Sequence, residues 1–388
     1  MRGSTNASVY PGGTIGVVGG GQLGRMFCVA AARLGYRTVV WSDRADGPAA
    51  SVAGFEVVGD YGDIGLARQF ARRCDVITFE FENIPAQTIA ACQNETPTHP
   101  ASNVLAISQD RVLEKSTLQS WGLPVTPFAP IASTDEARRF GLDHGVPFIL
   151  KTCRDGYDGK GQHRIDDLAQ LSSIDLRPHR DGAIDWIAER MISFTGEASV
   201  IVARSTLGET KMFGPIDNVH VNHILDLSTI PSRMPLESID SMLSIASRSA
   251  KAIGLVGLLC IEFFIDGVDV MINEIAPRPH NSGHVTIEAC HTDQFEQHVR
   301  AVCGLPLGDT SPRFPASAML NLLGCHWPTN EADWQRIANG PVHLHHYGKS
   351  GAASKRKLGH LTATGNNFNE VIERLRQARG DNRPPIGD

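Results

Sequence analysis

Apolar and polar positions change their spacing repeatedly along the chain, and the changes predict which segments form strands and which form helices. Runs of apolar residues typical of strands lie at residues 14–18, 38–43, 55–59 and 75–85. Amphipathic patterns with helical spacing lie between them, at residues 22–34 and 64–74. Strands and helices that alternate in this way predict a parallel sheet with helices packed against it.

The middle of the chain combines helical patterns with a strand that ends in a lysine. Residues 103–121 have a helical pattern, which a glycine and a proline end. A second helical pattern, at residues 133–145, precedes the apolar strand 146–151, whose last residue is Lys151. Glycines interleaved with charged residues follow at once, so neither a helix nor a strand is expected there.

A lysine at a strand end with a glycine-rich loop after it is typical of phosphoryl-transfer sites. The lysine supplies a point charge to phosphate oxygens, and the backbone N–H groups of the loop close over them. The order differs from that of a Walker A loop, in which the lysine follows the glycines. A hairpin tip without a ligand is the alternative interpretation.

Two apolar strands further along the chain, residues 261–265 and 270–275, are joined by a predicted tight turn at Asp266–Gly267. Side chains alternate along a strand, so Glu262 and Glu274 share one face if the register pairs them. Two close carboxylates repel each other, and a divalent cation with oxygen ligands relieves the repulsion. The pattern predicts a metal site, and a surface hairpin with solvated acids is the alternative. The loop that follows carries Arg278, His280, Asn281, Ser282 and His284.

A glycine turn near the N-terminus fits the pattern G-x-G-x-x-G through Gly19, Gly21 and Gly24. Such a turn lets a phosphate approach the unpaired N–H groups at a helix N-terminus. Asp43 ends the next strand, where dinucleotide-binding folds often hold a ribose hydroxyl, so a nicotinamide-dependent enzyme is one hypothesis. Glycines that only permit close packing of strand and helix are the other.

Composition narrows the class of protein. A chain of 388 residues predicts two to four domains, and 41% hydrophobic with 20% charged residues is typical of a globular protein. The net charge of −6 argues against a general nucleic-acid binder, and no apolar run has the length of a membrane helix. Eight cysteines without a C-x-x-C pair indicate buried, reduced thiols of a cytosolic protein. Residues 1–13 are polar and predict a loose extension, not a signal peptide.

The order of these features resembles the ATP-grasp superfamily: a lysine at a strand end, a glycine-rich flap, a glutamate after an apolar strand, then Glu and Asn-Glu on paired strands. The strings GGGQLGRM, TFEFENIP, GYDGKGQ and INEIAPRPHNSGH resemble the family of 5-(carboxyamino)imidazole ribonucleotide synthetases within it. The resemblance runs from about Thr14 to the helix near the C-terminus.

The resemblance implies an ATP-grasp fold of mixed α/β and α+β class. It combines an N-terminal Rossmann-like parallel sheet, a small lid domain, and a C-terminal antiparallel-sheet domain with a small β-rich C-terminal subdomain. After the extension at residues 1–13, these domains are expected at residues 14–109, 110–192, 193–312 and 313–388.

The resemblance also implies ATP and Mg²⁺ as cofactors, with Mn²⁺ as an alternative ion. The residues expected to contact ATP are Arg111, Lys151, Asp155, Gly156, Gly159, Lys160, Gly161, Gln162, Glu189, Arg190, Met191, Ile192, Glu197, His220, Asn273 and Glu274. Glu262 and Glu274 would hold the metal ion.

The reaction implied is the ATP-dependent carboxylation of aminoimidazole ribonucleotide by bicarbonate through carboxyphosphate, in purine biosynthesis. Its expected catalytic residues are Lys151, Asp158 beside the amine, and Arg278 beside bicarbonate. The residues expected to bind the ribonucleotide are Gln22, Leu23, Glu82, Tyr157, Asp158, Asn281, Lys349 and Arg356. The last two lie on a basic, glycine-containing loop that suits a phosphate dianion.

By the same resemblance we expect a cytoplasmic homodimer that passes its product to a separate mutase, since the chain ends in a polar tail and not in a mutase domain. Lys160 stands where arginine is common, and Asp155 stands where a small residue is common. Ala276 replaces a metal-binding asparagine of many ATP-grasp enzymes, as in the purine members. The alternatives are a formate-dependent glycinamide ribonucleotide transformylase-like enzyme and a non-catalytic or nicotinamide-type nucleotide-binding protein.

Overall fold

The alternating pattern near the N-terminus forms a parallel sheet with the strand order β3-β2-β1-β4. The computed structural model describes residues 8–154, 156, 161–176, 185–349, 351 and 353–381. The strands of this sheet are β1 (Thr14–Val18), β2 (Arg37–Ser42), β3 (Phe55–Val58) and β4 (Val76–Phe79). Its helical segments are α1 (Gln22–Arg33), η1 (Ala50–Val52), α2 (Ile64–Ala71) and α3 (Ala86–Gln93). The predicted Rossmann-like sheet is confirmed, although its fourth strand ends at Phe79, so the acids beyond it lie in a loop.

The long helix expected at residues 103–121 is instead two helices, α4 (Ser102–Ser108) and α5 (Arg111–Ser120). Asp110 causes the break, because its carboxylate accepts hydrogen bonds from the N–H groups of Val112 and Leu113 and so caps the start of α5. The new start turns the first residues of α5 towards the hairpin that carries Glu274.

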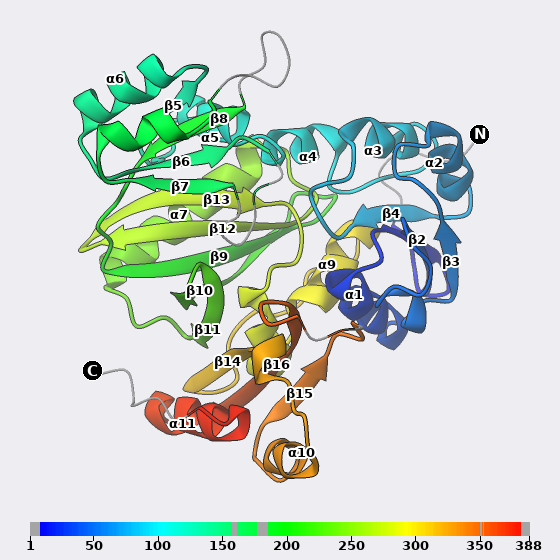
Figure 1. Ribbon diagram of the computed structural model, residues 1–388. Coiled ribbons are helices and arrows are strands. Elements are labelled where there is room, and N and C mark those ends of the chain that lie inside the picture. The colour runs from blue at the N-terminus through cyan, green and yellow to red at the C-terminus, as the bar shows by residue number, and fades with distance from the viewer. Residues whose placement is uncertain are drawn as a thin grey trace.

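A second sheet forms a separate layer at the top left of Figure 1. Its order is β5-β8-β6-β7, and its neighbouring strands are antiparallel. The strands are β5 (Phe128–Ile131), β6 (Phe148–Thr152), β7 (Gln162–Ile165) and β8 (Trp186–Arg190), with helical segments α6 (Thr134–His144) and η2 (Leu168–Ser173). Phe140, Phe148 and Leu150 are buried between this sheet and its helices. Lys151 therefore stands near the end of a well-packed strand, as predicted.

The largest sheet has the order β13-β12-β9-β10-β11-β14-β16-β15 and is antiparallel throughout. Its strands are β9 (Gly196–Arg204), β10 (Thr210–Val221), β11 (Ile224–Ile230), β12 (Gly257–Asp266), β13 (Asp269–Ala276), β14 (Ala316–Leu323), β15 (His343–His346) and β16 (Lys357–Gly365). The helical segments that follow or cover it are α7 (Leu236–Ala252), η3 (Ser282–Val285), α8 (Thr286–Ala289), α9 (Gln294–Cys303), η4 (Gly324–His326), α10 (Glu331–Ala338) and α11 (Phe368–Arg379). The C-terminal strands thus extend this sheet, because β14 pairs with β11.

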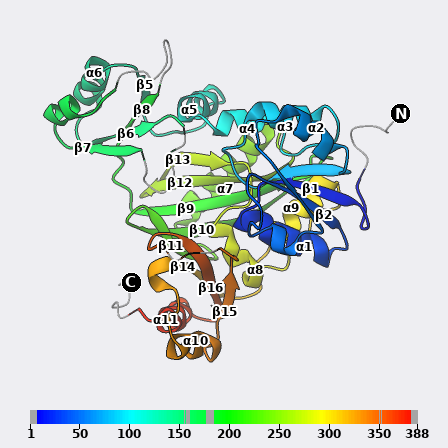
Figure 2. The ribbon, with the colours of Figure 1, turned by 45° about the vertical axis from the view of Figure 1, so that its right-hand side comes forward.

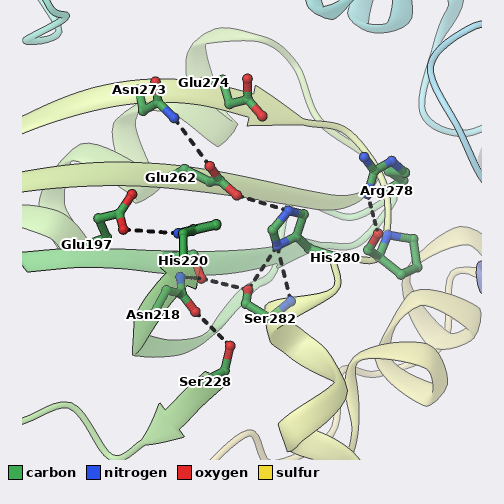
Figure 3. Close-up of polar contacts among 12 residues, drawn as sticks. Glu197, Asn218, His220, Ser228, Glu262, Asn273, Glu274, Arg278, His280 and Ser282 are labelled. Carbon is green, nitrogen blue, oxygen red and sulfur yellow. Dashed lines mark hydrogen bonds and ion pairs between the residues drawn. The ribbon is translucent and has the colours of Figure 1, made fainter. Parts of the chain in front are cut away.

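Alternation along the central strands divides the sheet into two faces. Ile261, Phe263 and Ile265 pack with residues of α7 in one hydrophobic core. Glu262 projects from the opposite face, because side-chain direction alternates along a strand. On that face Leu258 and Cys260 pack in a second hydrophobic core, and the predicted site residues gather around Glu262 (Figure 3).

The parallel sheet and its helices form the N-terminal unit. This unit is attached to the largest sheet through α9, which lies beside α1 in both ribbon views (Figures 1 and 2). His298 of α9 is buried, its Nε2 lies 2.8 Å from Thr78 Oγ1, and its ring packs edge-on against Phe27. Ser8 Oγ and the Val9 N–H donate to the carbonyls of Gly304 and Cys303 at 2.8 Å each. We expected residues 1–13 to form a loose extension, but the described part of that segment is held against the end of α9.

Seven of the cysteines are buried, Cys325 is exposed, and all eight are free thiols. Within the described ranges, no helix combines the length and the apolar character needed to cross a membrane.

Candidate active site

The hairpin formed by β12 and β13 brings the two predicted carboxylates together. Glu262 and Glu274 are direct register partners on these antiparallel strands, so their side chains leave the same face. The turn lies at Gly267–Val268, one residue beyond its predicted position, and Gly267 adopts a φ of +62° that favours glycine.

A β-bulge at Asn273 adds a third polar side chain to this pair. Glu262 pairs with Glu274 and Phe263 pairs with Ile272, so Asn273 is the extra residue. Its Nδ2 donates to Glu262 Oε2 at 3.4 Å, and its Oδ1 is buried without a hydrogen-bond partner among the described residues. Two carboxylates and a free amide oxygen form a donor set that suits Mg²⁺.

Glu262 is strongly stabilised in its charged form. Its Oε1 lies 3.1 Å from His280 Nε2. Burial by itself would raise the pKa of Glu262, but the hydrogen bond and charge of His280, with the charge of His220, outweigh burial and lower that pKa to about 2. The carboxylate is therefore ionised at neutral pH and available to a cation.

Glu274 is held from the side of α5. Arg111 Nη1 lies 2.8 Å from Glu274 Oε2, and Arg111 Nη2 donates to the Gly156 carbonyl at 3.0 Å. One arginine thus connects the hairpin to the segment that follows β6, and β6 is the strand that carries Lys151. Gly161 immediately precedes the return strand β7, and Gln162, the first residue of β7, pairs with Lys151 of β6.

Behind this arginine lies a buried ion cluster centred on Glu189 of β8. Lys115 Nζ and Lys151 Nζ lie 3.3 and 3.1 Å from Glu189 Oε2. Lys115 Nζ also donates to Thr126 Oγ1 at 2.8 Å and to the Asn273 carbonyl at 2.9 Å. Burial would raise the pKa of Glu189, but the two lysines outweigh it and lower that pKa to about 2.

A further ion pair lies on β9 and β10. His220 Nδ1 is 3.0 Å from Glu197 Oε2. Burial would lower the pKa of His220, but the hydrogen bond and charge of Glu197 raise it overall. Arg190 ends β8, and Met191 and Ile192 belong to the connection from there to β9. Phe194 of this connection stacks on Phe264 with ring centroids 4.8 Å apart.

The loop after β13 connects the carboxylates with the N-terminal unit. Arg278 Nε lies 2.7 Å from Glu82 Oε1, and both side chains are about one-fifth exposed. Asn281 is 9% exposed, and neither its Oδ1 nor its Nδ2 has a hydrogen-bond partner among the described residues. An unpaired amide this buried is costly, so its polar atoms indicate a ligand site.

Two segments far apart in the sequence meet beside this loop. Lys349 Nζ donates to Gln22 Oε1 at the start of α1, and it lies 5.7 Å from the centre of the Tyr347 ring. Leu23 is the next residue of α1 and packs against the core of the N-terminal unit. Arg356 immediately precedes β16, so the predicted basic loop does connect two strands.

The glycine motif near the N-terminus does not offer a free helix terminus. Glu80 fills it, since its carboxylate accepts hydrogen bonds from the N–H groups of Gly21 and Gly24, the latter at 2.7 Å. A Cβ on Gly19 or Gly21 would stand 2.3 or 2.4 Å from Glu80 atoms. The glycines therefore permit close packing around an internal carboxylate, which removes the structural basis for the dinucleotide hypothesis.

The predicted flap falls mostly outside the described residues, namely Asp155, Tyr157, Asp158, Gly159 and Lys160. Lys115 and His280 were not assigned a role from the sequence, although Lys115 shares a helical face with Arg111. Their partners, Glu189 and Glu262, lie 74 and 18 residues away along the chain, so local pattern carries no signal of either contact.

Comparison with known proteins gives the family. A ribonucleotide synthetase preATP-grasp domain matches residues 13–109, an ATP-grasp domain matches residues 116–295, and a phosphoribosylaminoimidazole carboxylase C-terminal domain matches residues 317–374. The N5-carboxyaminoimidazole ribonucleotide synthase of Bacillus subtilis is 40% identical over 357 residues, which is 91% of this chain and 92% of that protein.

Solved structures agree with this sequence similarity. The ADP complex of an N5-carboxyaminoimidazole ribonucleotide synthetase superposes with a TM-score of 0.90 at 37% identity, covering 96% of this chain and 97% of the other. The Aspergillus clavatus N5-carboxyaminoimidazole synthase, in complex with ADP and 5-aminoimidazole ribonucleotide, has a TM-score of 0.83 at 25% identity, covering 97% and 98%. The chain therefore belongs to the N5-carboxyaminoimidazole ribonucleotide synthase family of ATP-grasp enzymes.

Proposed function

We propose that this protein uses ATP to carboxylate 5-aminoimidazole ribonucleotide with bicarbonate. The products are 5-carboxyaminoimidazole ribonucleotide, ADP and phosphate. The observation that carries the proposal is the loop after β13, which joins the Glu262–Glu274 hairpin directly to the Arg278–Glu82 ion pair. A site for phosphoryl chemistry and a site for the carboxyl acceptor would thus be adjacent. The relatives solved with ADP, and with ADP and 5-aminoimidazole ribonucleotide, support it.

The nucleotide would bind between the four-stranded sheet β5-β8-β6-β7 and the largest sheet. Lys151 would contact its phosphates, and Glu197 with His220 would contact its ribose end. Met191 and Ile192 would line the adenine with backbone groups, since they follow β8 without strand pairing. The remaining predicted contacts are those of Arg111, Glu189, Arg190, Asn273, Glu274 and the flap residues 155–162.

Glu262, Glu274 and the free Oδ1 of Asn273 would hold Mg²⁺ together with phosphate oxygens, since Mg²⁺ in nucleotide sites takes few protein carboxylates. In the described part of the chain no group of three or more His, Cys, Asp or Glu side chains could hold a metal by itself. When bound, the ion would neutralise charge on the transferring phosphoryl group.

Arg278 would orient bicarbonate for attack on the γ-phosphorus. A bicarbonate oxygen forms the new P–O bond, the bond from phosphorus to the β,γ-bridging oxygen breaks, and ADP leaves with the electron pair. The resulting carboxyphosphate breaks down to carbon dioxide and phosphate. The exocyclic amine of the ribonucleotide attacks carbon dioxide and loses a proton, for which Asp158 is the proposed contact. A closed site protects carboxyphosphate from water.

The ribonucleotide would lie beside the N-terminal unit. Its phosphate would contact Lys349 and Arg356, whose guanidinium suits a dianion. Gln22 and Leu23 at the start of α1, Glu82, Asn281 and Tyr157 would contact the rest. The unsatisfied amide of Asn281 supports this placement.

Several broader expectations belong to the same proposal. The division into units at residues 14–109, 110–192, 193–312 and 313–388 is one. A cytoplasmic homodimer that releases its product to a separate mutase is another. Size-exclusion chromatography with light scattering tests the dimer directly.

Phosphate release from ATP tests the activity. We expect release that requires both bicarbonate and 5-aminoimidazole ribonucleotide, with one carbon from labelled bicarbonate entering the acid-labile product. Formate with glycinamide ribonucleotide serves as the control. Phosphate release with that pair, and none with the first, would instead identify a transformylase-like enzyme.

A further inference from the structure

Gln294, the first residue of α9, makes an unusual set of hydrogen bonds from a fully buried position. Its Oε1 accepts from the His280 N–H at 2.9 Å, and its Nε2 donates to the His280 carbonyl at 2.8 Å. The same Nε2 lies 3.0 Å from His284 Nδ1. One side-chain amide therefore pairs with the backbone of His280 as a neighbouring strand would, and also fixes a histidine ring.

The segment that Gln294 holds is the loop with the proposed bicarbonate and ribonucleotide contacts. Arg278 precedes His280 by two residues and reaches Glu82, whereas the His280 ring reaches Glu262. The loop has no room to shift towards α9, since a Cβ on Gly283 would stand 2.3 Å from Gln294 Oε1.

The loop contains little regular structure that could position it otherwise. Its residues from Pro277 to Asn281 belong to neither a strand nor a helix, and the short 3₁₀ turn Ser282–Val285 and the four-residue helix α8 follow. Pro277 and Pro279 lack N–H donors, so few backbone bonds are available there. The Gln294 amide satisfies both backbone groups of His280, which lies between Arg278 and Asn281.

We infer that Gln294 is a positioning residue for the carboxylation reaction: it holds the 278–284 loop so that Arg278 and Asn281 meet bicarbonate and the ribonucleotide while His280 stays on Glu262. The inference rests on the proposed function. Gln294 is fully buried, and it would act through the backbone of His280.

The same helix provides a matched control. Gln297 is also fully buried, and its amide makes the same two-bond contact with a different backbone: Nε2 donates to the Gly308 carbonyl at 3.0 Å, and Oε1 accepts from the Gly308 N–H at 2.8 Å. Gly308 lies outside the proposed site. Removing either amide takes away a similar pair of buried hydrogen bonds, but only one of them holds the site loop.

The experiment compares Gln294→Met with Gln297→Met, since methionine keeps the length of the side chain and removes its hydrogen bonds. We measure thermal unfolding and steady-state phosphate release, with ATP, bicarbonate and 5-aminoimidazole ribonucleotide varied in turn. Gln294→Met should lower kcat/KM for bicarbonate and for the ribonucleotide by about tenfold or more, because small misplacements of reacting groups cost this much. The KM for ATP should change by less than about threefold.

Gln297→Met should lower the melting temperature comparably and change each kcat/KM by less than about threefold. Equal losses of kcat/KM in the two variants would overturn the inference, because stability alone would then explain them. If Gln294→Met does not fold, Gln294→Glu keeps the acceptor for the His280 N–H but removes both donors, and the same selective loss is expected. If the wild-type protein shows no phosphate release that depends on the ribonucleotide, the proposed function is overturned, and the inference with it. If the wild type is active and the Gln294 variant is unimpaired, the inference alone is overturned.

Discussion

Arg278 Nε lies 2.7 Å from Glu82 Oε1, so a residue of the β13 loop forms an ion pair with a residue just beyond β4 in the N-terminal unit. Burial would lower the pKa of Arg278, but the charge and hydrogen bond of Glu82, with smaller effects of other groups, outweigh burial and raise that pKa. The pair joins the N-terminal unit to the loop that follows the hairpin carboxylates. In the proposed function, this arginine would lie where the two substrates of the carboxylation meet.

Replacing Arg278 by methionine should lower kcat/KM for bicarbonate by about a hundredfold or more, because it removes the cation proposed to stabilise the developing anion. Binding of ATP, measured by calorimetry, should change little. Glu82→Gln should have a smaller effect on bicarbonate and a larger one on the KM for the ribonucleotide. Unchanged use of bicarbonate by the Arg278 variant would contradict its assignment.

Glu274→Gln should lower kcat for phosphate release by about a hundredfold or more, since it removes a charged ligand from the proposed magnesium site. The variant should also need a higher Mg²⁺ concentration for half-maximal phosphate release. Asp269→Asn, on the exposed end of the same strand, is the control and should behave as wild type. Full activity of the Gln variant at ordinary Mg²⁺ concentration would argue against metal binding at Glu274.

Lys115→Met should lower the free energy of unfolding by about 3 kcal/mol, because it removes one of the two lysines that pair with the buried Glu189 carboxylate. The Lys115 side chain is 1% exposed and that of Glu189 is 3% exposed, so water cannot replace the lost contact. Lys251→Met, at an exposed position of α7, should stay within about 0.5 kcal/mol of wild type in the same denaturant titration. A Lys115 variant as stable as that control would show that the buried cluster contributes little.

Acid should weaken the attachment of the N-terminal unit through His298. Burial, followed by the charge of nearby His99, lowers the pKa of His298 to about 3, and burial lowers that of His99 to about 4. In the unfolded state the histidine binds a proton below about pH 6.5, whereas the folded residue stays neutral. The free energy of unfolding is therefore undiminished above about pH 6.5 and falls as the pH drops towards 3.

His298→Gln removes one such group and keeps a donor for Thr78. Between pH 6 and pH 5 the wild type should lose up to about 1.4 kcal/mol more unfolding free energy than this variant. Denaturant unfolding at the two pH values measures the difference. Identical losses in both proteins would mean that His298 does not titrate on unfolding.

Much of the site could be predicted from the sequence because its signals are local. Alternation along two apolar strands was enough to predict that Glu262 and Glu274 share a face if the register pairs them. The pairing itself depends on the turn at Gly267–Val268 and on the bulge at Asn273, which alternation did not predict. A lysine that ends an apolar strand and a basic loop between two strands are likewise readable from a few adjacent positions. The ATP-grasp fold was predicted because the order of these features along the chain resembles that superfamily, and the family comparison confirms it.

Other relationships depend on tertiary packing, and local pattern does not encode them. The break at Asp110 gave two helices where periodicity predicted one, because a capping carboxylate outweighed the continuing apolar pattern. Glu80 closed the glycine motif that could have held a phosphate, although it lies more than fifty residues from the motif in sequence. The contacts of Lys115 with Glu189, Arg278 with Glu82 and Gln294 with His280 join separate elements. The chain by itself thus determined which chemical groups are present and on which strands and loops they stand; only the folded structure decided which of them meet, since burial and charge pairing act between residues distant in sequence.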